Sequence, residues 1–283
     1  MRVASIVVRG MFLTCAMGCS LLGQRSRRYS EAPDPERATQ DWLDQCRDSN
    51  NRNGDDRERF CEVREKRLDP SRALDIDGRQ NGGVSVHGWD RPQVLVLAKI
   101  QADGEDVDEA RDIASQIEIQ TANGRVRAEG PSTRRHQSWA VSYEVWAPQQ
   151  TDLHLVTQNG GINVQDIDGR LDLTAVNGGI ALNGVSGDVH GQTTNGPLNV
   201  ELDGGRWRGN GLDLQTTNGP VNLSIPDGYS AHLETGTVNG GMRIDFPVTL
   251  QGNIGRRIAT DLGDGGPTIR ALTTNGPVNI RRR

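Results

Sequence analysis

The chain has 283 residues, of which 35 are glycine, 34% are hydrophobic and only 4% are aromatic. This composition is typical of a thin β structure with many turns, and it disfavours an enzyme built on a thick hydrophobic core. The formal net charge of -5 argues against a nucleic-acid-binding protein.

Residues 1–19 are expected to be a signal peptide that ends in a lipobox. Arg2 and Arg9 precede a short apolar run, and Cys19 stands where that run stops. Lipid attached to Cys19 would anchor the chain to a membrane and keep the rest of it outside the cytoplasm, in a bacterial cell envelope. An ordinary cleaved signal peptide and a short membrane anchor are the alternatives.

Residues 20–39 are polar and contain two prolines, which predicts a flexible tether. Residues 40–72 are expected to form a helical cysteine segment, with short helices over 40–47 and 56–67. Cys46 and Cys61 remain once Cys15 is removed with the signal peptide and Cys19 carries lipid. In an oxidising compartment such an isolated pair predicts a disulfide between Cys46 and Cys61.

Residues 73–150 are expected to be a small β-rich region with one helix. The helix is predicted over 105–117, where apolar residues recur on one face. Residues 118–130 predict two strands about an Asn-Gly turn. In the stretch SWAVSYEVW (138–146), apolar and smaller residues alternate, which is typical of a half-buried strand.

Residues 151–283 contain a repeat of about 20 residues with an Asn-Gly turn in each copy. The turns are Asn159-Gly160, Asn177-Gly178, Asn195-Gly196, Asn218-Gly219, Asn239-Gly240 and Asn275-Gly276. A threonine stands two residues before the asparagine in every copy except the one at Ala175. Self-similarity at this period is the signature of stacked supersecondary units.

Proline decides between two ways of folding these turns. In a tight two-residue hairpin, the residue after Asn-Gly donates its N–H across the turn, and Pro197, Pro220 and Pro277 have no N–H to donate. A corner between successive short strands fits them better. We therefore expect a mainly β protein with a repetitive β-solenoid-like C-terminal region, and an antiparallel β meander or sandwich is the alternative.

The recurring NGG and NGP turns, the stretch VSYEVWAP and the terminal TTNGPVNI together resemble the bacterial putative-adhesin family of β-strand-repeat domains. The resemblance covers residues 74–283. It implies repetitive β structure and an extracytoplasmic location, and it supplies no catalytic residues to carry over.

No other pattern in the sequence predicts catalysis, and we expect no catalytic, cofactor-binding or metal-binding residues. The five histidines are scattered, and none has a second histidine at metal-ligand spacing. Asp166, Asp168 and Asp172 form the densest acidic cluster, but they lie in a predicted turn, where aspartate is favoured for its bonds to the backbone.

We therefore predict a non-catalytic, lipid-anchored protein of the cell envelope, on its periplasmic face or at the cell surface. Its β-repeat surface would serve interaction or adhesion with a protein or polysaccharide partner, and it would not bind nucleic acid. One alternative is a solenoid protein that binds or cleaves carbohydrate. The other is an envelope regulator or sensor that acts through a partner.

Overall fold

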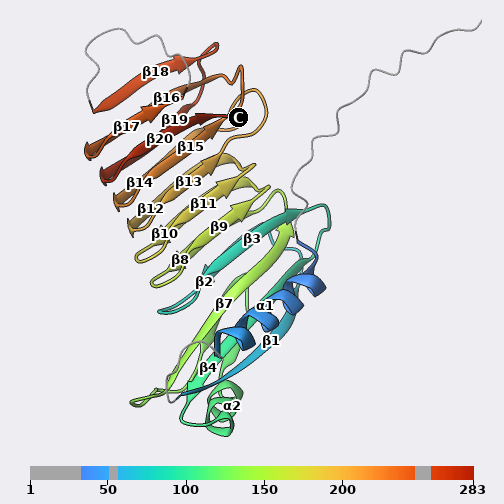
Figure 1. Ribbon diagram of the computed structural model, residues 1–283. Coiled ribbons are helices and arrows are strands. Elements are labelled where there is room, and N and C mark those ends of the chain that lie inside the picture. The colour runs from blue at the N-terminus through green and yellow to red at the C-terminus, as the bar shows by residue number, and fades with distance from the viewer. Residues whose placement is uncertain (1–32, 51–56, 246–255) are drawn as a thin grey trace, which may run out of the picture. The chain divides into compact units, whose positions relative to one another are not determined.

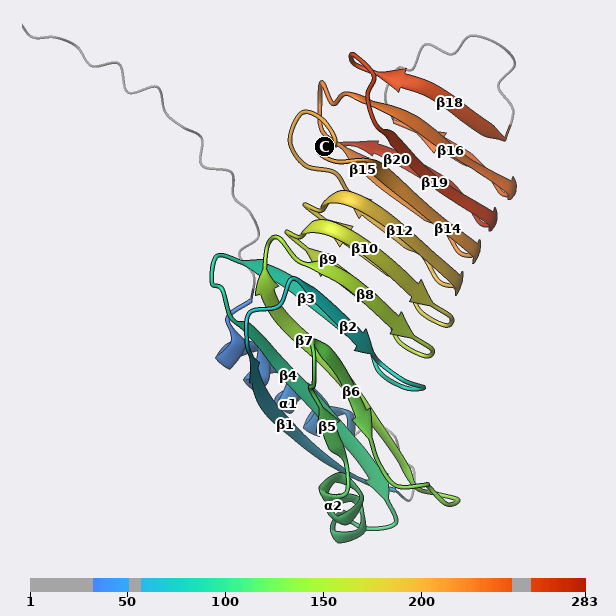
Figure 2. The same ribbon diagram turned by 180° about the vertical axis from the view of Figure 1, so that it is seen from behind.

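A computed structural model of the chain describes residues 33–50, 57–245 and 256–283. The predicted signal peptide with its predicted lipid acceptor Cys19, and most of the predicted tether, lie outside these residues. The described part contains the helices α1 (Pro35–Asn50) and α2 (Val107–Ser115) and two ten-stranded sheets, which face one another through the repeats (Figures 1 and 2). No helix in these described ranges is both long and apolar enough to cross a membrane.

We call the two sheets A and B. The order of sheet A is β1 (Glu58–Leu68), β4 (Val94–Gly104), β7 (Ser138–Pro148), β3 (Val84–Trp89), β9 (Ile162–Gln165), β11 (Ile180–Asn183), β13 (Leu198–Glu201), β15 (Val221–Ile225), β20 (Val278–Arg282) and β17 (Met242–Ile244). The order of sheet B is β18 (Arg257–Leu262), β16 (Ala231–Asn239), β19 (Thr268–Asn275), β14 (Gly211–Asn218), β12 (Ser186–Asn195), β10 (Asp168–Ala175), β8 (Asp152–Thr157), β2 (Ala73–Asp77), β6 (Arg125–Glu129) and β5 (Glu118–Gln120).

From β8 to β15 the chain alternates between the two sheets, so that each pair of consecutive strands forms one coil. Neighbouring coils pair in parallel and in register: Leu153 lies opposite Leu171 in sheet B, and Ile162 lies opposite Ile180 in sheet A. Alternate side chains point between the sheets, where they form one continuous aliphatic core. The β-solenoid-like fold is confirmed. The meander is wrong for these repeats, because a meander would pair consecutive strands antiparallel within one sheet.

The last coil of the chain lies inside the stack rather than at its end. Strand β19 pairs with both β14 and β16, and β20 pairs with both β15 and β17. Strand β18 then pairs antiparallel with the outer side of β16. The chain end is therefore held between two earlier coils (Figure 1), and the edges at this end of the stack belong to β17 and β18.

The helix expected over 105–117 forms as α2. It begins at the N-cap Asp106, whose side chain accepts a hydrogen bond of 2.8 Å from the backbone N–H of Glu109. It buries Ala110, Ile113 and Ala114 on one face. The strand pair expected around residues 118–130 also forms, as the antiparallel β5 and β6.

Helix α1 starts inside the segment that the sequence analysis assigned to the tether. Asp34 caps it, because its Oδ1 accepts from the backbone N–H groups of Glu36 (3.0 Å) and Arg37 (3.2 Å). Pro35 then occupies the first turn, where no N–H is needed. Residues 35–39 are therefore helical, and that part of the tether prediction was wrong.

The second helix predicted in the cysteine segment, over 56–67, was also wrong. Residues 58–68 form β1 instead, which pairs antiparallel with β4 along its whole length. Strand pairing outweighed a helix-like local pattern, because as a strand β1 packs against a different hydrophobic cluster on each of its two faces. Phe60 packs against the main core, whereas Val63 packs against a small cluster under α1 that contains Ala38, Leu97 and Trp146.

Candidate functional site

The six Asn-Gly turns of the repeats occupy equivalent corners of the stack and form a continuous ladder of side-chain amides. Each Nδ2 donates to the Oδ1 of the preceding coil in space, at 2.8–3.1 Å. In spatial order the asparagine ladder runs Asn81, Asn159, Asn177, Asn195, Asn218, Asn275 and Asn239. All the donors therefore point the same way along the stack, toward Asn81.

The sequence analysis missed Asn81, the first member of this ladder. The signal was present, since Gln80-Asn81-Gly82-Gly83 matches the turn at residues 158–161. It was obscured because Arg79 stands where most copies carry threonine. The repeat therefore begins one coil earlier than the predicted start at residue 151.

Stacking distance, rather than a hairpin conformation, explains the glycine of each corner. None of the ladder asparagines, nor the glycines that follow them, has a positive φ, which a type I′ hairpin requires. Instead, a Cβ on Gly196 would lie 2.2 Å from the carbonyl oxygen of Gly178, and a Cβ on Gly219 would lie 2.1 Å from that of Gly196. Proline fits the NGP copies because this position uses its carbonyl, and not an N–H, to bond the next coil. The carbonyl of Pro220, for example, accepts from the N–H of Leu198 (2.9 Å).

The threonines of the repeat unit lie buried beside the asparagine ladder. Their hydroxyls donate to corner glycine carbonyls at 2.6–2.9 Å, and the five are Thr157, Thr193, Thr216, Thr237 and Thr273. Four of these bonds join one coil to the next. A second amide ladder joins Asn199, Asn222 and Asn279 across sheet A. The repeated polar residues thus hold the corners together, which is a structural role.

Charged side chains form a line across the outer face of sheet B. In register order this charged row is Arg125, Asp75, His154, Asp172, His190, Asp213, Arg270 and Glu234. The residues on either side of each member along its strand are mostly buried and apolar, so the row itself points away from the core. Basic or titratable side chains alternate with acidic ones along its whole length.

Ion pairs connect parts of this row. The Nδ1 of His154 lies 3.1 Å from Asp75, and Arg125 lies 3.2 Å from the other oxygen of the same carboxylate. Arg270 lies 3.6 Å from Asp213 and 3.7 Å from Glu234. Pairs this exposed contribute only about 0–1 kcal/mol each to stability, so stability alone does not account for the row.

The histidines do not gather at a metal centre. His154, His190 and His232 lie on sheet B, each beside a carboxylate of its own, and His136 lies in the β6–β7 loop. His87 is buried on sheet A. Within the described ranges, no group of three or more histidine, cysteine or acidic side chains could hold a metal ion.

The acidic cluster of the sequence analysis is divided between a corner and a strand. Asp166 lies in the corner between β9 and β10 with φ 54°, a left-handed conformation that aspartate tolerates. Burial, with a smaller contribution from Asp203, raises the pKa of Asp166. Asp172 belongs to the charged row and pairs with Arg170 at 3.3 Å. The turn prediction is therefore right for Asp166 and wrong for Asp168 and Asp172, which lie in strand β10.

One buried charged group lies on sheet A, in the part that α1 covers. The Nε2 of His87 lies 3.2 Å from Glu144, and Lys99 donates to the other oxygen of that carboxylate. Burial works against the charged form, but the hydrogen bonds from His87 and Lys99 outweigh it and hold the pKa of Glu144 below its ordinary value. Both oxygens of Glu144 are thus paired, as in a structural ion pair, whereas Nδ1 of His87 is buried with no partner among the described residues.

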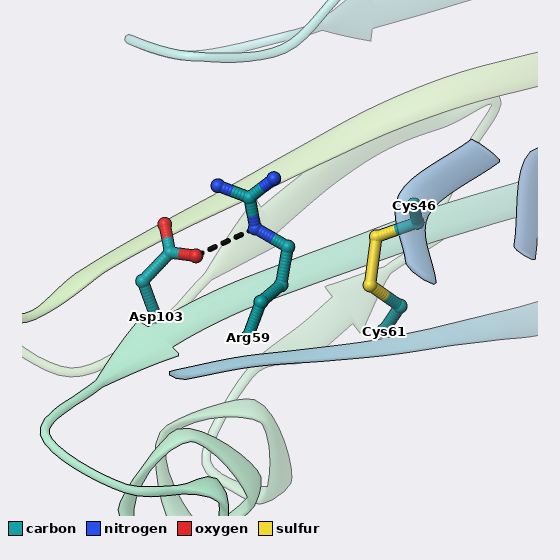
Figure 3. The surroundings of a disulfide bond; sticks show 4 residues. All are labelled: Cys46, Arg59, Cys61 and Asp103. Atoms are coloured by element: carbon teal, nitrogen blue, oxygen red, sulfur yellow. Dashed lines mark hydrogen bonds and ion pairs between the residues drawn. A yellow bond between two sulfur atoms is a disulfide. The ribbon is translucent and has the colours of Figure 1, made fainter. Parts of the chain in front are cut away.

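The predicted disulfide joins Cys46 of α1 to Cys61 of β1 (Figure 3). Their Cα atoms are 6.5 Å apart. Near it, Arg59 pairs with Asp103 of β4 at 2.7 Å, with both side chains less than 20% exposed. The disulfide therefore fastens α1 to the antiparallel edge of sheet A.

The pattern of stacked corners agrees with a known family. Residues 79–281 match the family model Toastrack DUF4097. The chain belongs to this family. The resemblance to the bacterial putative-adhesin proteins that the repeated turns indicated is thereby confirmed for this Toastrack chain.

Several solved structures are similar in fold to this Toastrack chain. A putative cell adhesion protein from Clostridium sporogenes is 8% identical with a TM-score of 0.42, covering 79% of this chain and 100% of that one. A putative adhesin from Bacteroides fragilis is 12% identical with a TM-score of 0.34, covering 78% and 97%. A putative lipid binding protein from Parabacteroides distasonis is 9% identical with a TM-score of 0.31, covering 78% and 96%. No curated protein matches the chain.

Proposed function

We propose that this protein is a non-catalytic, lipid-anchored component of the bacterial cell envelope that contacts a partner protein through the outer face of sheet B. The observation that carries the proposal is the charged row. The row lies on a regular stack whose corners are already held together by the asparagine ladder. Its exposed ion pairs contribute little to stability, so the row can serve recognition. The four carboxylates of the row outnumber its two arginines, which favours a partner with a basic surface.

The repeat scaffold suits this role physically. A solenoid presents a long and regular face without needing a cleft, and its shape is set by contacts between neighbouring coils. Breaking an exposed ion pair costs little free energy, so a partner can replace these pairs with its own charges. A polysaccharide that carries cationic groups is the other outcome that the binding test below can reveal.

Lipid anchoring is tested by replacing the predicted acceptor. Cys19→Ser is expected to release the protein from the membrane fraction and to abolish its labelling with a fatty acid. Cys15→Ser serves as the matched control, because Cys15 lies within the predicted signal peptide, and it should leave both unchanged. Membrane retention of Cys19→Ser together with an unlabelled wild type would refute the anchor.

The binding surface is tested with labelled protein added to cells of the source bacterium. The double variant Asp172→Asn/Asp213→Asn removes two charges from the row, and Glu201→Gln removes one from the outer face of sheet A as a control. We expect binding by the double variant to fall several-fold and to lose much of its dependence on ionic strength. Equal binding by wild type, control and double variant would show that sheet B is not the contact face.

A further inference from the structure

A groove of about 830 Å³ lies beside the first corners of the stack, on the side where β7 runs on past β3. One side of it is the first half of β7 and the start of the β6–β7 loop, and the other is the corner residues of the first three coils. Its size falls within the range of small-molecule sites, about 300–1,000 Å³. The groove shares no residue with the charged row, although Asp77, Val156 and Thr174 lie on the same face of sheet B, two positions beyond members of the row. Its ligand is argued from different residues, so the inference does not rest on the function proposed above.

The backbone of Arg79, which lines the groove, has an unusual conformation. Arg79 is the extra residue in the first coil, since Gly78 donates to the carbonyl of Val156 and the carbonyl of Arg79 accepts from Gln158. It holds φ 54°, which is unfavourable for arginine, and its backbone N–H donates to Oδ1 of Asp77 at 2.8 Å. Strained residues and bulges of this kind cluster at ligand-binding sites.

The guanidinium of Arg79 is fixed at one point and open at others. Its Nε donates to the carbonyl of Ala128 at 3.2 Å, whereas its two terminal nitrogens donate to none of the described residues. The terminal nitrogens are therefore available as hydrogen-bond donors. Asp77, whose Oδ1 accepts from the backbone N–H of Arg79, also lines the groove and adds an acceptor.

A buried hydroxyl lies at the same place. Tyr143 lines the groove and is 2% exposed, and its hydroxyl makes no hydrogen bond of full geometry, although it lies near the backbone of Ala128. Buried polar groups nearly always have a partner, and an exception calls for an unseen water or ligand. Trp139, partly buried, lines the groove four residues away along the same face of β7.

The chemistry of the lining identifies a class of ligand. The lining contains Arg79, Asp77 and Glu129, and Glu129 pairs at 2.7 Å with Arg127, which lies just outside the lining, so these four formal charges sum to zero. Its lining combines aromatic residues with hydrogen-bond donors and acceptors, including the exposed side chains of Ser132 and Thr133. We propose that this groove binds a neutral saccharide, whose hydroxyls both donate and accept and whose ring faces are apolar.

Two substitutions separate binding from folding. Arg79→Gly removes the guanidinium and relieves the unfavourable φ, and Tyr143→Phe removes a hydroxyl that makes no hydrogen bond of full geometry. Neither is expected to lower the unfolding midpoint by much. Asn123→Gly is the matched control, because Asn123 also has a positive φ (55°) but lies in the β5–β6 turn outside the groove.

Binding is measured with the full chain by tryptophan fluorescence and by saturation-transfer NMR. The probes are the neutral trimers chitotriose, maltotriose and xylotriose, with an alginate trimer as the acidic comparison. We expect saturable binding of a neutral trimer, weakened about 10- to 100-fold by Arg79→Gly and about 2- to 10-fold by Tyr143→Phe, and unchanged by Asn123→Gly. Binding of the alginate trimer alone, of no probe, or equally by wild type and Arg79→Gly would overturn the proposal.

Discussion

The asparagine ladder allows a quantitative test of what holds the coils together. Asn218 lies in the middle of the ladder, where it donates to Asn195 at 2.9 Å and accepts from Asn275 at 2.8 Å. Asn218→Ala removes both bonds. At about 0.5–1.5 kcal/mol for each bond, the loss is about 1–3 kcal/mol. The freed amides are exposed and can bind water, so we expect the lower half of this range.

Two controls isolate the ladder from other effects. Asn239 ends the ladder and makes only one of its bonds, so Asn239→Ala should cost about half as much. Thr217 precedes Asn218 on the same strand with an exposed side chain, and Thr217→Ala should change stability by no more than about 0.5 kcal/mol. The loss of stability in the three variants should therefore scale with the number of ladder bonds that each one removes: two, one and none.

The assay is urea unfolding followed by circular dichroism, with the slope of free energy against urea compared among the variants. An unchanged slope with a lower midpoint assigns the effect to native-state stability. If Asn218→Ala costs no more than Thr217→Ala, the ladder contributes nothing measurable. If Asn218→Ala and Asn239→Ala cost the same, the asparagines act through their own corners and not through the bonds between coils.

Three further predictions concern other parts of the scaffold. Gly196→Ala should cost about 1–3 kcal/mol or prevent folding, because its Cβ would meet the Gly178 carbonyl, whereas Gly205→Ala has open space and should be neutral in the same urea assay. Cys46→Ser should lower the unfolding free energy by about 2–4 kcal/mol and make α1 sensitive to protease; equal protease resistance in wild type and variant would contradict this role for the disulfide. Because the fold lowers the pKa of Glu144, its contribution is present above the unfolded-state pKa and is lost as pH falls through the lower folded-state value. Glu144→Gln should therefore be less stable than wild type near neutral pH, with a difference that shrinks below about pH 4; a difference independent of pH would show that the charge of Glu144 is not involved.

Local patterns in the sequence were enough to predict much of the repeat region. The period of about 20 residues, the alternation of apolar residues and the NGP turns predicted parallel coils with the asparagines at equivalent corners. These features repeat the same local chemistry in every coil, and each coil packs mainly on its neighbours. The direction of the amide bonds and their order through Asn275 and Asn239 were not visible, because both depend on how the coils stack.

Other features depend on contacts between residues far apart in the chain. Residues 58–68 are a strand because β4 offers them a complete antiparallel partner, which outweighs their helix-like local pattern. The groove exists because β7 runs past a corner that Arg79 distorts. The sequence of β7 does not indicate that it lies beside the corner at Arg79, so the groove could not be predicted. The sequence by itself thus determined the coil, its core and its polar corners, because these follow from periodicity. Only the tertiary structure decided that the last coil fits between two earlier ones, because identical corners make several stacking orders locally equivalent and the whole set of contacts selects one.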